Sequence, residues 1–291
     1  MTQARLNLSI GIDGGGSSCR FALDACGQRV EVRQGAANVS TDLEGALATL
    51  TQGLEALAES AGLALRDLAD ARAYLGLAGV VSPAIAAEVS ARLPLRHAVV
   101  EDDRIAAVVG ALGPGDGTVI GIGTGSFLGR RAAGRLDLIG GWGFVLGDEA
   151  SGAVLGRKLL SRALHDADRL DAGSDLTVEI LSELGGPAGI VGFAAETTPA
   201  GFARFAPRIV AAAQAGDHVA SDLMAEGAAY IIRGLDRLGW TPGGRLCPIG
   251  GLAREYAAFL PDGVSRCLTE PDGSALDGAL ALARALPDDG G

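Results

Sequence analysis

The chain contains the same glycine-rich turn twice, and this internal repeat restricts the possible fold more than any other feature. Residues 10–17 are IGIDGGGS and residues 120–126 are IGIGTGS, and in both a β-rich run leads into the turn. Two strand-like runs follow each turn, so each copy predicts a three-stranded meander whose first hairpin has a glycine-rich tip. These further runs are residues 20–24, 29–34, 127–131 and 135–139.

After each meander the hydrophobic period changes from two to about 3.6, which predicts alternating helices and strands. The predicted helices are residues 41–62, 83–93, 103–112, 150–170, 175–184, 198–215, 219–238 and 275–285, and the strands are 73–77, 98–101 and 246–249. This order predicts a duplicated α/β fold with an N-terminal domain at 1–115 and a C-terminal domain at 116–291. The second domain carries a helical insertion, and the last helix has the option of packing back on the first domain. We expect a ligand cleft between the halves; the alternative is a chance match of eight residues.

The two turns predict phosphate binding, because glycines leave backbone N–H groups exposed and permit positive φ angles. The first turn comprises Asp13, Gly14, Gly15, Gly16 and Ser17, and the second comprises Gly123, Thr124, Gly125 and Ser126. A carboxylate beside a triphosphate requires a cation, so Asp13 predicts Mg²⁺ held through water. A plain glycine hairpin is the alternative for each turn. The pattern is neither a Rossmann fingerprint nor a Walker loop, because a strand follows the first turn and Lys158, the only lysine, lies far away.

The composition narrows the choice of partners and compartment. The net charge is −11 with no basic stripe, which argues against nucleic acid and anionic membranes. Cys19, Cys26, Cys247 and Cys267 form no CxxC pair and show no zinc spacing, so no structural zinc is expected. The N-terminal segment lacks the pattern of a signal peptide, and no run of eighteen apolar residues occurs. We therefore expect a cytoplasmic protein.

The DGGGS and GTGS turns resemble the two phosphate motifs of the sugar kinase, heat-shock chaperone and actin superfamily. Residues 140–149, GGWGFVLGDE, resemble the GGWGxxxGDEGS motif of the N-acetylglucosamine kinase branch, which is grouped with the BadF/BadG/BcrA/BcrD ATPases. The resemblance extends from residue 10 to about residue 285 and departs after Glu149, where Ala150 precedes Ser151. It implies duplicated actin-like (ribonuclease H-like) ATPase domains with an interdomain active-site cleft, ATP and Mg²⁺. It also implies phosphorylation of an amino sugar, first N-acetyl-D-glucosamine at its 6-hydroxyl, with glucosamine or a muramic-type sugar as alternatives.

The resemblance assigns a catalytic base to one of two adjacent acids. Family members carry an Asp at this strand end, and alignment of the following helix places it at Asp103, which would also contact the sugar. Asp102 falls where relatives often have Asn. Sugar phosphorylation needs a base for the attacking hydroxyl, but Asp is also a favoured N-cap, so either residue could serve the helix instead.

The same resemblance implies a sugar site and an adenosine site. The sugar residues are Asn38, Asp103, Gly141, Trp142, Gly143 and Asp148, and the adenosine residues are Gly216, Gly250 and Gly251. Each has a simpler alternative. Asn38 could be an ordinary turn residue, Trp142 a core aromatic, Asp148 a helix cap, and the glycines ordinary helix and strand ends.

Two other functions remain as alternatives. An activator ATPase of a reductase or dehydratase would hold an iron–sulfur cluster on cysteines of the second domain, but no cysteine lies between Gly27 and Leu246, so no cluster is expected. A non-catalytic sugar sensor would not need acids at Asp13, Asp103 and Asp148. A homodimer is implied by the family alone.

Overall fold

The computed structural model describes residues 8–16 and 18–287, which form two compact units. Unit 1 combines the described residues up to Gly115 with those from Pro271 onward, and unit 2 is Asp116–Glu270. The last helix therefore belongs to unit 1, so the second unit ends at Glu270 and not at residue 291.

Unit 1 is built on a five-stranded sheet in the order β3-β2-β1-β4-β5. The first three strands form the antiparallel meander, and β4 and β5 run parallel to β1. The strands are β1 (Leu8–Gly14), β2 (Cys19–Ala25), β3 (Gln28–Gln34), β4 (Arg72–Leu77) and β5 (His97–Asp102). The helices are α1 (Leu43–Ser60), η1 (Leu65–Leu68), α2 (Pro83–Arg92), α3 (Asp103–Leu112) and α11 (Ala275–Ala285).

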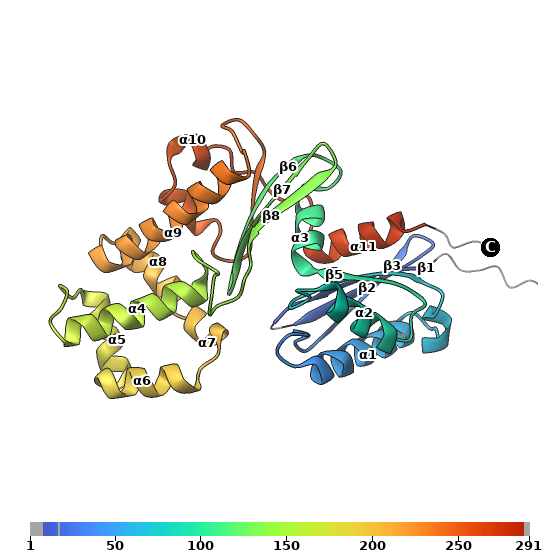
Figure 1. Ribbon diagram of the computed structural model, residues 1–291, viewed down its shortest axis with the longest axis horizontal. Helices are drawn as coiled ribbons and strands as arrows, with labels where there is room; N and C mark the ends of the chain where they lie inside the picture. The colour runs from blue at the N-terminus through green and yellow to red at the C-terminus, as the bar shows by residue number, and fades with distance from the viewer. Residues whose placement is uncertain (1–7, 17, 288–291) are drawn as a thin grey trace, which may run out of the picture. The chain divides into compact units, whose positions relative to one another are not determined.

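Strand alternation divides the packing of unit 1 between the two faces of its sheet. On β1, Ile10 and Ile12 are buried in the core cluster that includes the leucines of α1. Gly11 points the other way, and a Cβ there would lie 2.5 Å from the backbone nitrogen of Leu280. The absence of a side chain at Gly11 thus lets α11 lie directly on the sheet, on the same side as α3 (Figure 1).

Unit 2 repeats the meander in a four-stranded sheet of order β8-β7-β6-β9, with β9 parallel to β6. Its fifth strand is reduced to one parallel bridge between Leu246 and Leu268, beside which the Thr269 N–H donates to the Leu246 carbonyl over 2.8 Å. The repeat is therefore complete in unit 1 and shortened in unit 2. The strands are β6 (Gly117–Ile122), β7 (Ser126–Ala132), β8 (Arg135–Gly140) and β9 (Leu246–Ile249).

The rest of unit 2 is helical (Figure 1). Buried residues of its sheet and helices pack together in a shared core cluster. The predicted helix at 198–215 is two helices, because Pro207 is confined to a first helical turn. A further helix, which the sequence analysis did not predict, occupies 186–196. The helices are α4 (Gly152–Ala167), α5 (Asp175–Leu184), α6 (Gly186–Glu196), α7 (Pro199–Ala203), α8 (Ala206–Gln214), α9 (His218–Arg237), η2 (Glu255–Ala258) and α10 (Asp262–Ser265).

Across residues 8–16 and 18–287, no single helix has the length and apolar composition needed to cross a membrane. The consecutive helices α5 and α6 reach that length and composition only when taken together, and they are bent by 74°.

Candidate active site

A row of paired residues crosses the sheet of unit 1 near the carboxyl end of β1. Asp13 lies opposite Arg20 on β2 and beside Gly76 on β4, and Gly76 lies beside Glu101 on β5. Paired positions project their side chains to the same face. This is the face on which α3 and α11 pack. Arg20, Asp13 and Glu101 therefore project from it near the start of α3, together with Gly76, which has no side chain.

Asp13 is buried and is held by a cation that the sequence analysis did not single out. The Arg20 guanidinium donates through Nε to Asp13 Oδ2 over 2.9 Å, and its Nη2 donates to the same oxygen. A charged partner offsets the cost of burying the carboxylate. Arg20 could have been found by pairing β1 and β2 around the predicted hairpin, which sets Asp13 opposite it.

The first turn leaves open space above its tip. The Gly15 N–H donates to the Ser18 carbonyl over 3.0 Å. Apart from the chain neighbours of Gly16, no atom of residues 8–16 and 18–287 would lie within 4 Å of a Cβ on this glycine. The first turn does not use the positive φ angles that its glycines permit, because Gly14, Gly15 and Gly16 all lie outside that region. Gly14 is instead limited by space, since a Cβ there would lie 2.6 Å from Leu77 Cδ2. Ser17 lies outside the described residues.

The loop carrying Asn38 is fastened to the first turn and to the end of β4. The Ala37 N–H donates to the Gly15 carbonyl over 3.0 Å, and the Val39 N–H donates to the Ala78 carbonyl over 3.1 Å. The Asn38 Oδ1 accepts from the backbone N–H and the hydroxyl of Ser40 at 3.1 and 2.9 Å. The structure therefore brings Asn38 to the same sheet edge as the turn, with its amide oxygen engaged locally.

The adjacent acids at the start of α3 have different surroundings. Asp102 is the N-cap: its Oδ1 accepts the Arg104 backbone N–H over 2.9 Å, and its carboxylate also binds the Arg104 guanidinium at 2.6 and 2.7 Å. Asp103 is half-buried in the first turn of the helix. Burial, followed by the negative charges of Asp102 and Asp13, raises the pKa of Asp103 to about 7, against the opposing effect of Arg104. A carboxyl that titrates near neutral pH suits general-base chemistry.

The second turn is fixed to the start of α4 within unit 2. The Gly152 N–H donates to the Gly123 carbonyl over 2.8 Å, and the Ala153 N–H donates to the Thr124 carbonyl over 3.3 Å. Ser126 is buried, and its hydroxyl donates to the Glu149 carbonyl. These hydrogen bonds hold the turn in place, and the Ser126 hydroxyl proton is engaged by a carbonyl of unit 2 itself.

Gly250 and Gly251 also lie against the second turn. Gly250 has a φ of +85°, and a Cβ there would lie 2.4 Å from the Ile122 carbonyl oxygen, so only glycine fits. Gly251 faces open space. The strand end expected to hold adenosine is thus adjacent to the second glycine-rich turn.

The segment 140–149 approaches the same turn through Asp148. This residue is buried, with a φ of +58°, and its Oδ1 accepts the Gly143 N–H over 3.3 Å. A Cβ on Gly125 would lie 2.9 Å from Asp148 Oδ2, so the carboxylate lies against the turn. Ser151, not Asp148, caps α4 by accepting the Val154 N–H, which removes the helix-cap alternative for Asp148.

Trp142 is not a core residue, since 72% of its surface is exposed. Gly141 and Gly143 on either side have φ angles of +73° and +85°, which turn the chain so that the ring projects outward. Phe144 anchors the segment instead, stacking on Phe202 with ring centroids 5.1 Å apart. The exposed Trp142 ring is therefore carried by a segment that the packing of Phe144 holds in place.

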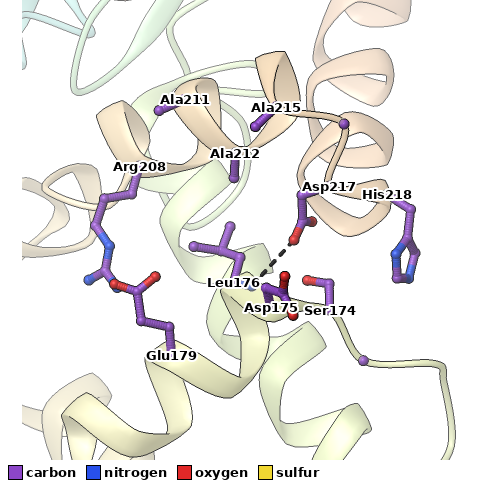
Figure 2. Close-up of a pocket in the computed structure, with 12 residues that line it drawn as sticks. Ser174, Asp175, Leu176, Glu179, Arg208, Ala211, Ala212, Ala215, Asp217 and His218 are labelled. Atoms are coloured by element: carbon purple, nitrogen blue, oxygen red, sulfur yellow. Dashed lines mark hydrogen bonds and ion pairs between the residues drawn. The ribbon is translucent and has the colours of Figure 1, made fainter.

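Gly216 has a different environment from Gly250 and Gly251. It lies between α8 and α9 with a φ of +90°, at a cavity of about 660 Å³ (Figure 2). Asp217 beside it accepts the Ala220 N–H at 2.9 Å and the Leu176 N–H at 3.3 Å, which joins the starts of α9 and α5. Gly216 therefore lies among residues of α5, α8 and α9. The residues placed above against the second turn are different ones, namely Asp148, Glu149, Gly152, Ala153 and Gly250.

The Asp13 carboxylate suits a Mg²⁺ ion bound through water. Within residues 8–16 and 18–287, no three His, Cys, Asp or Glu residues are grouped to hold a metal. In the same ranges Arg20 engages Asp13 Oδ2, and no partner is recorded for Oδ1. Mg²⁺ keeps several waters and needs only one or two carboxylates, so Asp13 Oδ1 would hold it through water.

The comparison with protein families decides the relationship. The model of the BadF/BadG/BcrA/BcrD ATPase family matches residues 10–266. The chain belongs to this family. The resemblance inferred from the two turns and the GGWG segment is thereby confirmed.

Individual relatives are sugar kinases by name. Glucosamine kinase GspK of Vibrio cholerae is 29% identical over 282 residues, covering 96% of each chain. The N-acetylmuramic acid/N-acetylglucosamine kinase of Clostridium acetobutylicum is 30% identical over 183 residues, covering 60% of this chain and 59% of its own. The crystal structure of a proposed N-acetylglucosamine kinase from Chromobacterium violaceum has a TM-score of 0.86 and 29% identity, covering 96% of this chain and all of that chain. The expected actin-like α/β fold is confirmed.

Proposed function

We propose that this protein transfers the γ-phosphoryl group of ATP to the 6-hydroxyl of an amino sugar. Its family and named relatives make it an ATP-dependent sugar kinase. The observation that carries the proposed chemistry is the Asp103 carboxyl, half-buried beside the first turn with a pKa of about 7. Such a group is able to accept a hydroxyl proton at neutral pH and needs no other base.

In the proposed reaction Asp103 orients the attacking hydroxyl and takes its proton as the bond to phosphorus forms. The hydrogen bonds between Asp102 and Arg104 support this role, because they fix the first turn of α3, which carries Asp103. Phosphoryl transfer depends mostly on positioning and charge stabilisation. A carboxyl fixed at a helix start provides that positioning.

We assign the phosphates to the two glycine-rich turns, with Asp13, Gly14, Gly15, Gly16 and Ser17 from the first and Thr124, Gly125 and Ser126 from the second. The open space above Gly16 and the fixed backbone of the second turn support this assignment. Asp13 would hold Mg²⁺ through water, and the ion would neutralise charge on the phosphates. Gly250 and Gly251 are assigned to adenosine, because they lie against the second turn; Gly216 stays a weaker assignment to the same nucleoside.

The sugar is assigned to Asn38, Asp148, Trp142 and the backbone of Gly141 and Gly143. The Asn38 amide nitrogen is the group offered to a sugar oxygen, since its amide oxygen is engaged by Ser40. The Asp148 carboxylate can accept two sugar hydroxyls. The exposed Trp142 ring offers an apolar face to the sugar ring.

Glucosamine is the first substrate to test, and N-acetylglucosamine the second. A glucosamine kinase by name aligns over nearly the whole of both chains. The proposed N-acetylglucosamine kinase from Chromobacterium violaceum aligns as fully at the same identity, so the relatives alone do not rank the two sugars. Glucosamine is placed first, the reverse of the order expected from the sequence motifs, because a protonated amine suits the carboxylates assigned to the site better than a neutral acetamide does.

The proposal is tested by coupled ADP release from purified protein with Mg-ATP. The acceptors are glucosamine, N-acetylglucosamine, N-acetylmannosamine, glucose and anhydro-muramic acid. We expect turnover with one amino sugar, its loss in Asp103→Asn, and its retention in Asp102→Asn, the matched neighbouring acid. ADP release that ignores every sugar would replace the proposal with an ATPase coupled to a protein partner.

A further inference from the structure

Arg20 is placed to reach a nucleotide bound at the first turn. It is the second residue of β2, the strand that leaves that turn, and 45% of its side-chain surface is exposed. Its guanidinium lies on the same face of the sheet as Asp13, the next-to-last residue of β1. The cation therefore flanks the backbone N–H groups assigned to phosphate.

The hydrogen bonds of Arg20 leave part of its guanidinium available. Both recorded donors, Nε and Nη2, point to one oxygen of Asp13. Within residues 8–16 and 18–287 no partner is recorded for Nη1. A guanidinium has five N–H donors in a planar fork that matches phosphate oxygens, so Arg20 has donors for an oxyanion while it holds Asp13.

Electrostatics favours a rearrangement of the Arg20–Asp13 ion pair when a nucleotide binds. An unpaired Asp13 carboxylate beside the turn would repel a phosphate, and the Arg20 charge reduces that repulsion. If a bound cation neutralised Asp13, the Arg20 guanidinium would be free to turn toward the anion. The neighbouring Arg33 on β3 lies opposite Arg20 but one strand further from Asp13, which makes it a matched control.

We infer that Arg20 is a phosphate-binding residue that exchanges Asp13 for a β- or γ-phosphate oxygen of ATP. The inference rests on the proposed binding of ATP at the first turn. It adds a protein cation to a site that the sequence had suggested would depend on backbone amides and metal.

The decisive experiment measures nucleotide affinity by titration calorimetry in EDTA, without sugar. It compares Asp13→Asn with the double variant Asp13→Asn/Arg20→Ala, so that the carboxylate is removed from both. If Arg20 binds phosphate, its loss weakens ATP binding about tenfold or more even in this background, as for a charged hydrogen bond. AMP binding stays unchanged, and Arg33→Ala in the same background stays within about twofold for ATP.

Three further results decide the matter. Equal ATP affinity with and without Arg20 in the Asp13→Asn background would overturn the inference, because Arg20 would then serve Asp13 alone. An equal loss of ATP and AMP affinity would also overturn it. Arg20→Lys in the same background should recover part of the ATP affinity, since it keeps the charge but not the fork, and it replaces the alanine variant if that one unfolds. Because no sugar is present, failure here is distinct from failure of the kinase proposal.

Discussion

Asp103 lies directly over Gly76, so that the start of α3 rests on a strand position without a side chain. A Cβ on Gly76 would lie 3.3 Å from the Asp103 Cα and 3.1 Å from the Ala106 Cβ, both tighter than ordinary contact. Gly76 also separates Asp13 from Glu101 in the row across the sheet. The height of the candidate base above the sheet is therefore set by this one glycine.

Gly76→Ala should lower kcat about tenfold while changing stability little, because the helix start must move by a few tenths of an ångström. Alanine favours the strand conformation over glycine, which offsets the crowding. Steady-state kinetics and thermal unfolding measure the two effects. Gly192→Ala, in α6 with open space around its Cβ, is the control and should leave kcat unchanged; an unchanged kcat in Gly76→Ala would disprove the positioning role.

The pH dependence of the reaction should follow Asp103. The base acts only when deprotonated, and its pKa is raised to about 7, so kcat/KM should rise with pH through about 7 and then level off. Asp103→Asn should lower kcat by about a hundredfold or more. A pH–rate profile with no limb near 7 would assign the proton to another group.

Asp102→Asn should shift that limb to lower pH with little loss of stability. The Asp102 charge is the second cause of the raised pKa of Asp103, and removing it also leaves the opposing Arg104 charge uncompensated. Asparagine keeps the N-cap. The shift is measured in the same pH–rate profile, and a limb that moves upward or stays fixed contradicts the electrostatic account.

The ionised Asp103 carboxylate should lower the free energy of unfolding once the pH exceeds its ordinary pKa of 3.8. Its folded pKa of about 7 exceeds its ordinary value of 3.8, so the folded state binds more protons between these values and stability falls as pH rises through that window. Asp103→Asn removes this loss. Its melting temperature should exceed that of the parent at pH 8 and approach it at pH 4, as differential scanning calorimetry can measure.

Asp148→Asn should raise the KM for the sugar about tenfold or more and leave the KM for ATP within about twofold. The substitution removes the charge but suits the φ of +58°, because Asn tolerates the left-handed region. Asp137→Asn, an exposed acid on β8, is the control. Equal changes in both KM values would indicate damage to the second turn and not a sugar contact.

Local signals predicted most elements of the fold. The helices at 103–112, 175–184 and 275–285 begin after Asp102, Ser174 and Ser274, whose side chains cap them. The shortened fifth strand of unit 2 could not be predicted, because it depends on how Leu268 meets Leu246 across the sheet.

The residues of the candidate site likewise fall into those that the sequence could predict and those that it could not. Motifs pointed to Asp13, Asp103 and Asp148, since their neighbours in sequence are distinctive. Arg20 and Gly76 carry no motif, and their positions follow only from strand register and from the packing of α3. The roles assigned to the motif residues stay predictions.

The return of α11 to unit 1 reverses the order in which the two units can mature on the ribosome. Residues 116–270 leave the exit tunnel before residues 271–287 have emerged, so unit 2 can close its core first. Until α11 arrives, Gly11 and Ala22 lack the helix that covers them. The half of the protein that is translated first must therefore wait for α11 before this part of its sheet is covered.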